Sequence, residues 1–322
     1  MLLPRCRRPF RRSAIITTVL MLMLAVSCGD SAVDELQPFT VPLPDIAAMS
    51  QLATGEIVAG DRKTGTIYKF SLVDPEPLTI GRLPVSSDGQ RGLLGLTVLD
   101  GDRIFVAWTR PDEQLVVAEI PAGPDESGEP AEPRLVWSGF VSSTGANGGH
   151  LELLPDGRLV LGVGTLRRSA LIDDPDVVNG KMLAIEPDGD PDQVPEILSS
   201  GWKNPFAFVV TDVGELWVAD NEPEDGSSER IGRGDTPDAP LVDVVDQLAP
   251  SALIELGPKK LGVCSFITGE LRSISLFDDG FGSGQPGPAL ASGCRTAALV
   301  IDDDWILLSD QESLQLQRLS DR

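Results

Sequence analysis

The sequence predicts an all-β protein, a six-bladed β-propeller preceded by a lipoprotein signal peptide. Three observations support the propeller. No long stretch of the chain repeats apolar residues at helical spacing. The chain contains 33 Gly and 26 Pro, residues that interrupt strands and form turns. A β-hairpin pattern, in which two apolar and β-branched runs flank a turn, occurs six times.

The six hairpins are nearly evenly spaced. Their first strands begin near residues 56, 103, 158, 215, 261 and 305, with spacings of 47, 55, 57, 46 and 44 residues. The paired runs are Glu56–Ala59 with Thr66–Phe70, Arg103–Thr109 with Gln114–Ile120, Arg158–Val163 with Lys181–Ile185, Glu215–Ala219 with a longer irregular return, Leu261–Ile267 with Glu270–Leu276, and Trp305–Ser309 with Leu314–Leu319. This period is typical of propeller blades, in which a hairpin is half of a four-stranded sheet. Propellers bind ligands through loops at one end of the central channel, so the irregular loops are where we expect function.

The N-terminus has the features of an export signal. Five Arg between Arg5 and Arg12 precede an apolar run, Ala14–Val26, that is too short for a comfortable membrane span. The run ends in Leu24-Ala25-Val26-Ser27-Cys28, which resembles the bacterial lipobox, in which the Cys is lipidated and becomes the new N-terminus. An ordinary cleavage site that happens to end at a Cys is the alternative.

The lipobox resemblance implies a division of the chain. Residues 1–27 are the expected signal peptide, 28–38 a tether and 39–322 the propeller. Lipid on Cys28 would hold the protein on the extracytoplasmic face of a membrane without spanning it. We therefore expect a cell-envelope lipoprotein.

Charge argues against nucleic acid as a partner. The first 27 residues hold five of the 26 basic residues and no acid, so the remainder has 21 basic and 49 acidic residues and a formal net charge of −28. Such a surface repels phosphate backbones.

Two Cys are left in the mature chain. Cys6 leaves with the signal peptide and Cys28 takes lipid, so Cys264 and Cys294 remain. Outside the cytosol such a pair tends to form a disulfide, and two buried thiols are the alternative. Metal binding is not favoured, because no neighbouring Cys or His supplies further ligands.

Three segments together resemble the glucose/sorbosone dehydrogenase family, whose soluble members use pyrroloquinoline quinone (PQQ). They are Gly92–Leu96 followed by Ile104–Thr109, Asn147–Leu151 followed by Pro155–Leu159 and Asn179–Gly189, and Gly201–Phe206 followed by Gly214–Asn221. The order matches over residues 45–320. The resemblance implies a six-bladed propeller with PQQ at the channel mouth, a calcium ion beneath it, and a His that takes the sugar hydroxyl proton.

The expected general base is missing. The family's His stands immediately before Asn-Gly-Gly, where this chain has Ala146. His150, the only His, lies four residues later, roughly 13 Å away in an extended strand, whereas a base needs hydrogen-bond reach of about 3 Å. A register shift could bring it closer, but a strand His with a structural partner is the simpler interpretation.

Several cofactor-binding positions also differ. The family's Arg-Asn-Pro is Lys203-Asn204-Pro205, and Lys lacks the planar guanidinium fork. The family's cofactor-binding Lys corresponds to Ile267, and of the Arg residues near Cys294 only Arg295 remains. The resemblance thus implies a cofactor site at Lys203, Asn204 and Arg295 that has lost much of its positive charge.

An acidic loop stands where the family builds its calcium site. Asp220, Asn221, Glu222 and Pro223 offer carboxylate and carbonyl oxygens, which suit a hard cation. A solvated acidic loop is the alternative.

Three functions follow as hypotheses. The first is a catalytically degenerate propeller that binds a small molecule, such as a sugar, or an envelope protein. The second is PQQ- and calcium-dependent oxidation of aldose sugars with a modified active site. The third is a metal-dependent hydrolase of the propeller type, which needs several carboxylates converging on the channel.

Overall fold

The structure, a computed structural model, describes residues 36–121, 132–221, 229–234, 240–244 (backbone only), 248–276 and 286–319. These residues belong to one compact unit, Leu36–Arg322. The predicted signal peptide, Cys28 and most of the tether lie outside them. In the described ranges, no helix has the length and apolarity needed to cross a membrane.

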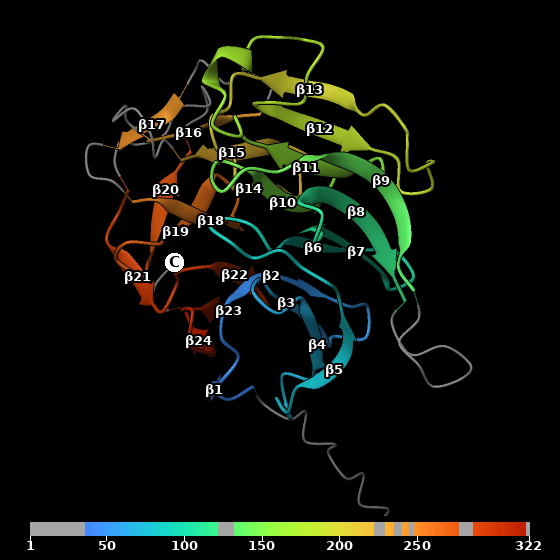
Figure 1. The fold of residues 1–322 in the computed structure, drawn as a ribbon. Helices are drawn as coiled ribbons and strands as arrows, with labels where there is room; N and C mark the ends of the chain where they lie inside the picture. Colours follow the sequence, from blue (N-terminus) through green and yellow to red (C-terminus); the bar gives the residue numbers. More distant parts are fainter. Residues whose placement is uncertain are drawn as a thin grey trace, which may run out of the picture. The chain divides into compact units, whose positions relative to one another are not determined.

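Six four-stranded antiparallel sheets form the propeller, as predicted (Figure 1). The first three sheets are β2 (Ile46–Gln51), β3 (Ile57–Asp61), β4 (Thr66–Phe70) and β5 (Leu78–Arg82); β6 (Leu93–Leu99), β7 (Arg103–Thr109), β8 (Gln114–Ile120) and β9 (Arg134–Val141); and β10 (Gly148–Leu153), β11 (Leu159–Val163), β12 (Lys181–Ile185) and β13 (Glu196–Ser200). The next two are β14 (Ala207–Val210), β15 (Leu216–Asp220), β16 (Glu229–Arg233) and β17 (Pro240–Val244); and β18 (Pro250–Gly257), β19 (Lys260–Ser265), β20 (Glu270–Ser275) and β21 (Ala289–Ser292).

The sixth sheet closes the ring with both ends of the described chain. It consists of β22 (Ala297–Val300), β23 (Trp305–Ser309), β24 (Leu314–Arg318) and β1 (Phe39–Val41), in the order β1-β24-β23-β22. Phe39 pairs with Leu316 and Val41 with Leu314. The blue strand β1 lies beside the red strand β24 in Figure 1. This pairing covers the edge of β24 and holds the first and last blades together.

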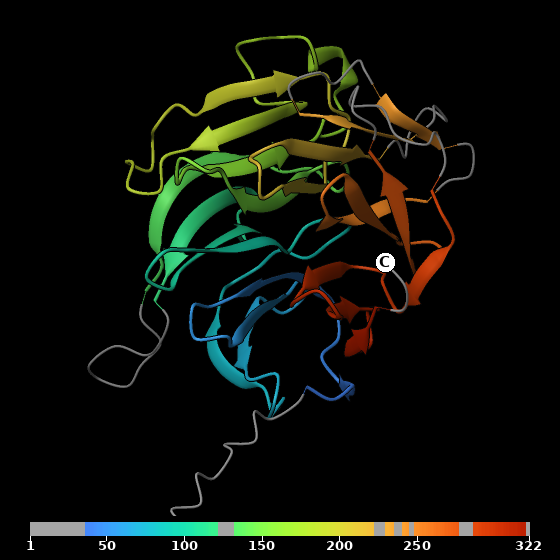
Figure 2. The same ribbon diagram turned by 180° about the vertical axis from the view of Figure 1, so that it is seen from behind.

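The core is divided into six clusters, one between each pair of neighbouring blades. The central strands are buried on both faces and are therefore almost wholly apolar, as in β11, Leu-Val-Leu-Gly-Val. Among the largest fully buried side chains are Trp202, Trp217 and Phe208. Burial of each such side chain stabilises the fold by about 1.5–3 kcal/mol. Figure 2 shows the same stack of blades from behind.

The first strand of each blade lies innermost. Strands β2, β6, β10, β14, β18 and β22 contact one another in a closed ring. These strands run in the same direction relative to the ring, so the segments that precede them meet at one end. That end is where the family resemblance places the site.

One predicted strand ends earlier than expected. The run Leu261–Ile267 corresponds to β19, which stops at Ser265. The backbone N–H of Gly269 donates to the carbonyl of Ser265, and the N–H of Thr268 donates to Ser265 Oγ. This turn begins before Phe266 and Ile267, so both residues belong to a loop and not to a strand.

Candidate functional site

A cavity of about 450 Å³ lies where the inner strands begin. We call it the mouth cavity. Its volume falls in the range of roughly 300–1,000 Å³ that is usual for small-molecule sites. All six blades contribute to its wall, each through a residue at or just before its inner strand. These residues are Asp45, Gln90, Gly148, Asn204, Pro250 and Arg295.

Ala146, at the position where the family resemblance implies the base, is buried and tightly held. Its side chain cannot accept a proton, and the residue is 2% exposed. Its backbone has a φ of 53°, a conformation that Asn, Asp and His adopt more readily than Ala. Its N–H donates to Gln90 Oε1 at 2.6 Å. Burial and a backbone hydrogen bond thus fix Ala146 in place, and its side chain supplies no acid–base group.

The two glycines after Asn147 are required by close packing. Gly148 and Gly149 have φ values of 67° and 100°. A Cβ on Gly148 would collide with the carbonyl oxygen of Gly162, and a Cβ on Gly149 would lie 2.6 Å from Leu94 Cβ. Only glycine suits both the left-handed backbone and the missing space. The Asn-Gly-Gly segment is therefore a structural element of the channel mouth.

His150 lies outside the mouth cavity. It lines a second cavity of about 940 Å³ together with Glu152. Its Nε2 is 3.2 Å from Glu152 Oε1, and its ring packs edge-on against Phe208 with 4.7 Å between centroids. Residues 146–150 are not fully extended, because Ala146, Gly148 and Gly149 have positive φ, and His150 lies within β10. His150 has the partners that a structural role requires.

Lys203 and Asn204 are positioned by a buried carboxylate. Asp220 is 2% exposed, and its oxygens accept hydrogen bonds from the backbone N–H groups of Lys203 and Asn204 at 2.7–3.0 Å. Arg230 Nε also donates to Asp220, at 3.1 Å. Burial raises the pKa of Asp220, and Arg230 with the two amides opposes this shift. Asn204 lines the mouth cavity and accepts from the N–H of Gly148, whereas Lys203 is not among the lining residues.

The calcium-site prediction falls partly on undescribed residues. Asn221 lines the mouth cavity, while Glu222 and Pro223 lie outside the described residues. The oxygens of Asp220 already accept from N–H donors, so we do not propose Asp220 as an ion ligand. In the described parts of the chain no group of three or more His, Cys, Asp or Glu could hold a metal ion.

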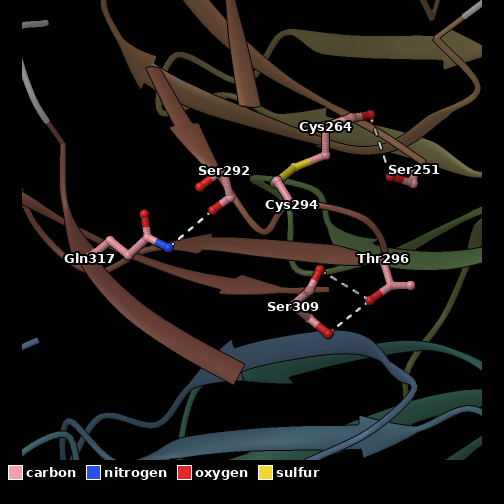
Figure 3. The surroundings of a disulfide bond; sticks show 7 residues. All are labelled: Ser251, Cys264, Ser292, Cys294, Thr296, Ser309 and Gln317. Atoms are coloured by element: carbon pink, nitrogen blue, oxygen red, sulfur yellow. Dashed lines mark hydrogen bonds between the residues drawn. A yellow bond between two sulfur atoms is a disulfide. The ribbon is translucent and has the colours of Figure 1, made fainter. Parts of the chain in front are cut away.

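Arg295 is joined to the loop that carries Ile267. Its Nη1 donates to the carbonyls of Phe266 at 2.6 Å and Ile267 at 3.1 Å. The preceding residue, Cys294, forms a disulfide with Cys264, with 5.2 Å between their Cα atoms (Figure 3). The pair lies in the core between the fifth and sixth blades. The disulfide thus ties the base of the Phe266–Ile267 loop to the segment that presents Arg295.

Arg62, Gln90 and Glu229 are among the lining residues that the sequence did not indicate. Arg62 follows β3, and its Nη1 donates to the carbonyls of Gly89 at 3.0 Å and Arg91 at 2.8 Å. Glu229 is 4% exposed, and its carboxylate accepts from the N–H groups of Leu248 and Ala249. Burial raises the pKa of Glu229, and these two amides offset part of the shift.

The structure is a six-bladed propeller with a ligand-sized cavity at its channel mouth. Residues 44–233 match the Glucose / Sorbosone dehydrogenase family, and the chain belongs to this family.

Solved structures share the fold at low sequence identity. The PQQ-bound aldose sugar dehydrogenase of Streptomyces coelicolor is 19% identical, with a TM-score of 0.72 over 88% of this chain and 99% of that one. A putative glucose dehydrogenase from Thermus thermophilus is 20% identical, with a TM-score of 0.74 over 88% and 100%. The apo-form soluble aldose sugar dehydrogenase of Escherichia coli is 18% identical, with a TM-score of 0.70 over 89% and 100%. No curated protein matches the sequence.

The cavity residues do not match the charge of PQQ, which has three carboxylates. The lining holds two cationic side chains, Arg62 and Arg295, and two acidic ones, Asp45 and Glu229. At the position where the family resemblance implies a Lys, Ile267 presents an apolar side chain that is 50% exposed. An exposed apolar side chain cannot neutralise a carboxylate. Among the described lining residues, no additional cation takes the place of the missing Lys. The donor set therefore fits a less charged ligand than PQQ.

Proposed function

We propose that this protein is a cell-envelope lipoprotein whose propeller binds a small ligand at the mouth cavity without PQQ-dependent sugar oxidation. The observation that carries the proposal is Ala146. A general base must lie within about 3 Å of the proton it removes. In this chain the family's position for that base holds a buried methyl group, and the only His lies in another cavity.

The binding role is supported by what the cavity retains. It has a ligand-sized volume, polar groups from several blades, and the buried amide of Asn204. Such features are usual in pockets that bind small molecules.

The first test is aldose-dependent dye reduction by the purified chain with added PQQ and calcium. We expect no turnover above a protein-free control. The variant Ala146→His restores the base, and its φ of 53° is accessible to His. We expect this variant also to be inactive, because Ile267 and Lys203 remain. Aldose-dependent turnover by the unmodified chain would refute the proposal.

PQQ-dependent aldose oxidation with a modified site is the second candidate. It is favoured by the placement of Asn204 and Arg295, both of which line one cavity at the channel mouth. Under this candidate a proton acceptor other than Ala146 would have to take the sugar hydroxyl proton, and the test above would show turnover. For the metal-dependent hydrolase, no feature of the described residues offers support.

The lipid anchor is part of the proposal. It rests on the N-terminal sequence ending in Cys28. The test is fractionation of cells that express the full chain or its Cys28→Ala variant. We expect the full chain in the membrane fraction with incorporated fatty acid, and the variant without lipid. Unlipidated wild-type protein would contradict the anchor and leave the ligand proposal intact.

A further inference from the structure

The rim of the mouth cavity exposes adjacent apolar side chains. Phe266 is 44% exposed and Ile267 is 50% exposed, and both line the cavity with the partly buried Phe206. Large apolar side chains exposed beside a polar cavity mark surfaces that contact a ligand. Because Phe266 and Ile267 lie in a turn and not in a strand, neither has a place in the inter-blade core.

The same loop carries a fixed guanidinium. Arg295 Nη1 donates to the carbonyls of Phe266 and Ile267, which holds the group against the apolar rim. Within the described part of the chain, Arg295 Nε and Nη2 make no hydrogen bond. The Nε–Nη2 edge of a guanidinium matches the two oxygens of a carboxylate. Because Nη1 already holds the Arg295 guanidinium in place, the side chain would lose little conformational freedom on binding a carboxylate.

A second cation lies on the cavity wall. Arg62 is held in the same way, through Nη1 to the carbonyls of Gly89 and Arg91. The two acids of the wall are already engaged. Asp45 forms an ion pair with Lys63 at 2.7 Å, and Glu229 accepts from two backbone amides. The wall thus offers a ligand two guanidinium groups, an apolar rim, and neutral polar side chains such as Asn221 and Gln311.

We propose that the mouth cavity binds an amphipathic monocarboxylate, with the carboxylate on the free edge of Arg295 and an apolar ring or chain against Phe266, Ile267 and Phe206. Arg62 adds positive charge from the first blade. The inference rests on the proposed binding function and names its ligand class. It differs from a sugar, which has no charge and little apolar surface.

The probe is 2-naphthoate, and its neutral isostere 2-naphthalenemethanol is the comparison. Each is titrated calorimetrically into the full chain in detergent. We expect 2-naphthoate to bind at least tenfold more tightly than the alcohol, because only the carboxylate gains the charge-assisted pair with Arg295. Equal affinities, or no binding of 2-naphthoate, would overturn the inference without relying on any variant.

Variants then locate the site. Arg295→Gln should weaken 2-naphthoate binding tenfold or more and leave the alcohol unchanged, whereas Phe266→Ala should weaken both. The matched control is Arg110→Gln, which removes an exposed ion pair to Asp112 away from the cavity. The assignment would be contradicted if Arg110→Gln no longer bound 2-naphthoate more tightly than the alcohol. It would also be contradicted if Arg295→Gln still did so.

The PQQ assay separates this inference from the proposed function. Turnover with PQQ and aldose would refute the proposed function whatever naphthoate does. Absence of turnover combined with absence of carboxylate preference would leave a binding protein with a different ligand and would refute only the monocarboxylate inference.

Discussion

The Cys264–Cys294 disulfide allows a quantitative prediction. The bond closes a loop with a sequence separation of 30 residues. In the chain-entropy relation, a loop of this length lowers the entropy of the unfolded chain by about 12 cal/mol/K, or about 3.6 kcal/mol at 25 °C. With an unfolding entropy of about 2.1 cal/mol/K per residue for a unit of about 290 residues, this corresponds to about 6 °C in Tm. The double variant Cys264→Ser/Cys294→Ser should therefore unfold about 6 °C earlier.

The assay is thermal unfolding followed by circular dichroism. The wild-type chain treated with a thiol reductant should move toward the Tm of the double variant, and the double variant itself should not respond to reductant. Because the bond ties Arg295 to the Phe266–Ile267 loop, 2-naphthoate affinity should fall as well. A double variant with unchanged Tm and unchanged affinity would refute the reasoning.

Three further predictions concern the blades. Ion pairs with Arg103 and Arg134 lower the pKa of Glu119 to about 2. Their contribution to stability should be complete above pH 4.5 and vanish as the pH falls through 2, so the Tm advantage over Glu119→Gln should disappear on acidification. Asp220→Ala removes the acceptor of several buried donors and should cost about 3 kcal/mol by urea unfolding. Gly148→Ala should cost about 1–3 kcal/mol, because its φ is 67° and its Cβ would meet the carbonyl of Gly162; a neutral effect in either variant would contradict these contacts.

The propeller could be predicted because each blade leaves its own signal in a short stretch of sequence. Each hairpin has a turn and two apolar runs, and six of them at near-equal spacing require a repeated sheet. Strand β1 carries no hairpin signal, since Phe39–Val41 pairs only with β24 at the far end of the chain. The same limit applies to Ile267, because the end of β19 is set by the hydroxyl and carbonyl of Ser265. A turn of this kind has no strong sequence signature.

The site was predicted less completely than the fold. Of the three residues that the resemblance implies for the cofactor site, Asn204 and Arg295 line the mouth cavity and Lys203 does not. Asp220 supports the Lys203–Asn204 backbone, a role that sequence cannot show because it depends on the meeting of the end of β15 with the segment before β14. Arg62, Gln90 and Glu229 escaped notice, because each stands among ordinary polar residues and is brought to the cavity only by the ring of blades.

PQQ binding is the decisive measurement for the loss of PQQ-dependent function. PQQ with calcium is titrated calorimetrically into the wild-type chain and into Ile267→Lys, which restores a cation at the exposed rim. We expect no saturable binding to the wild-type chain and measurable binding to the variant, because the wild-type cavity lacks the charge for three carboxylates. Saturable PQQ binding to the wild-type chain, accompanied by aldose-dependent dye reduction, would contradict it.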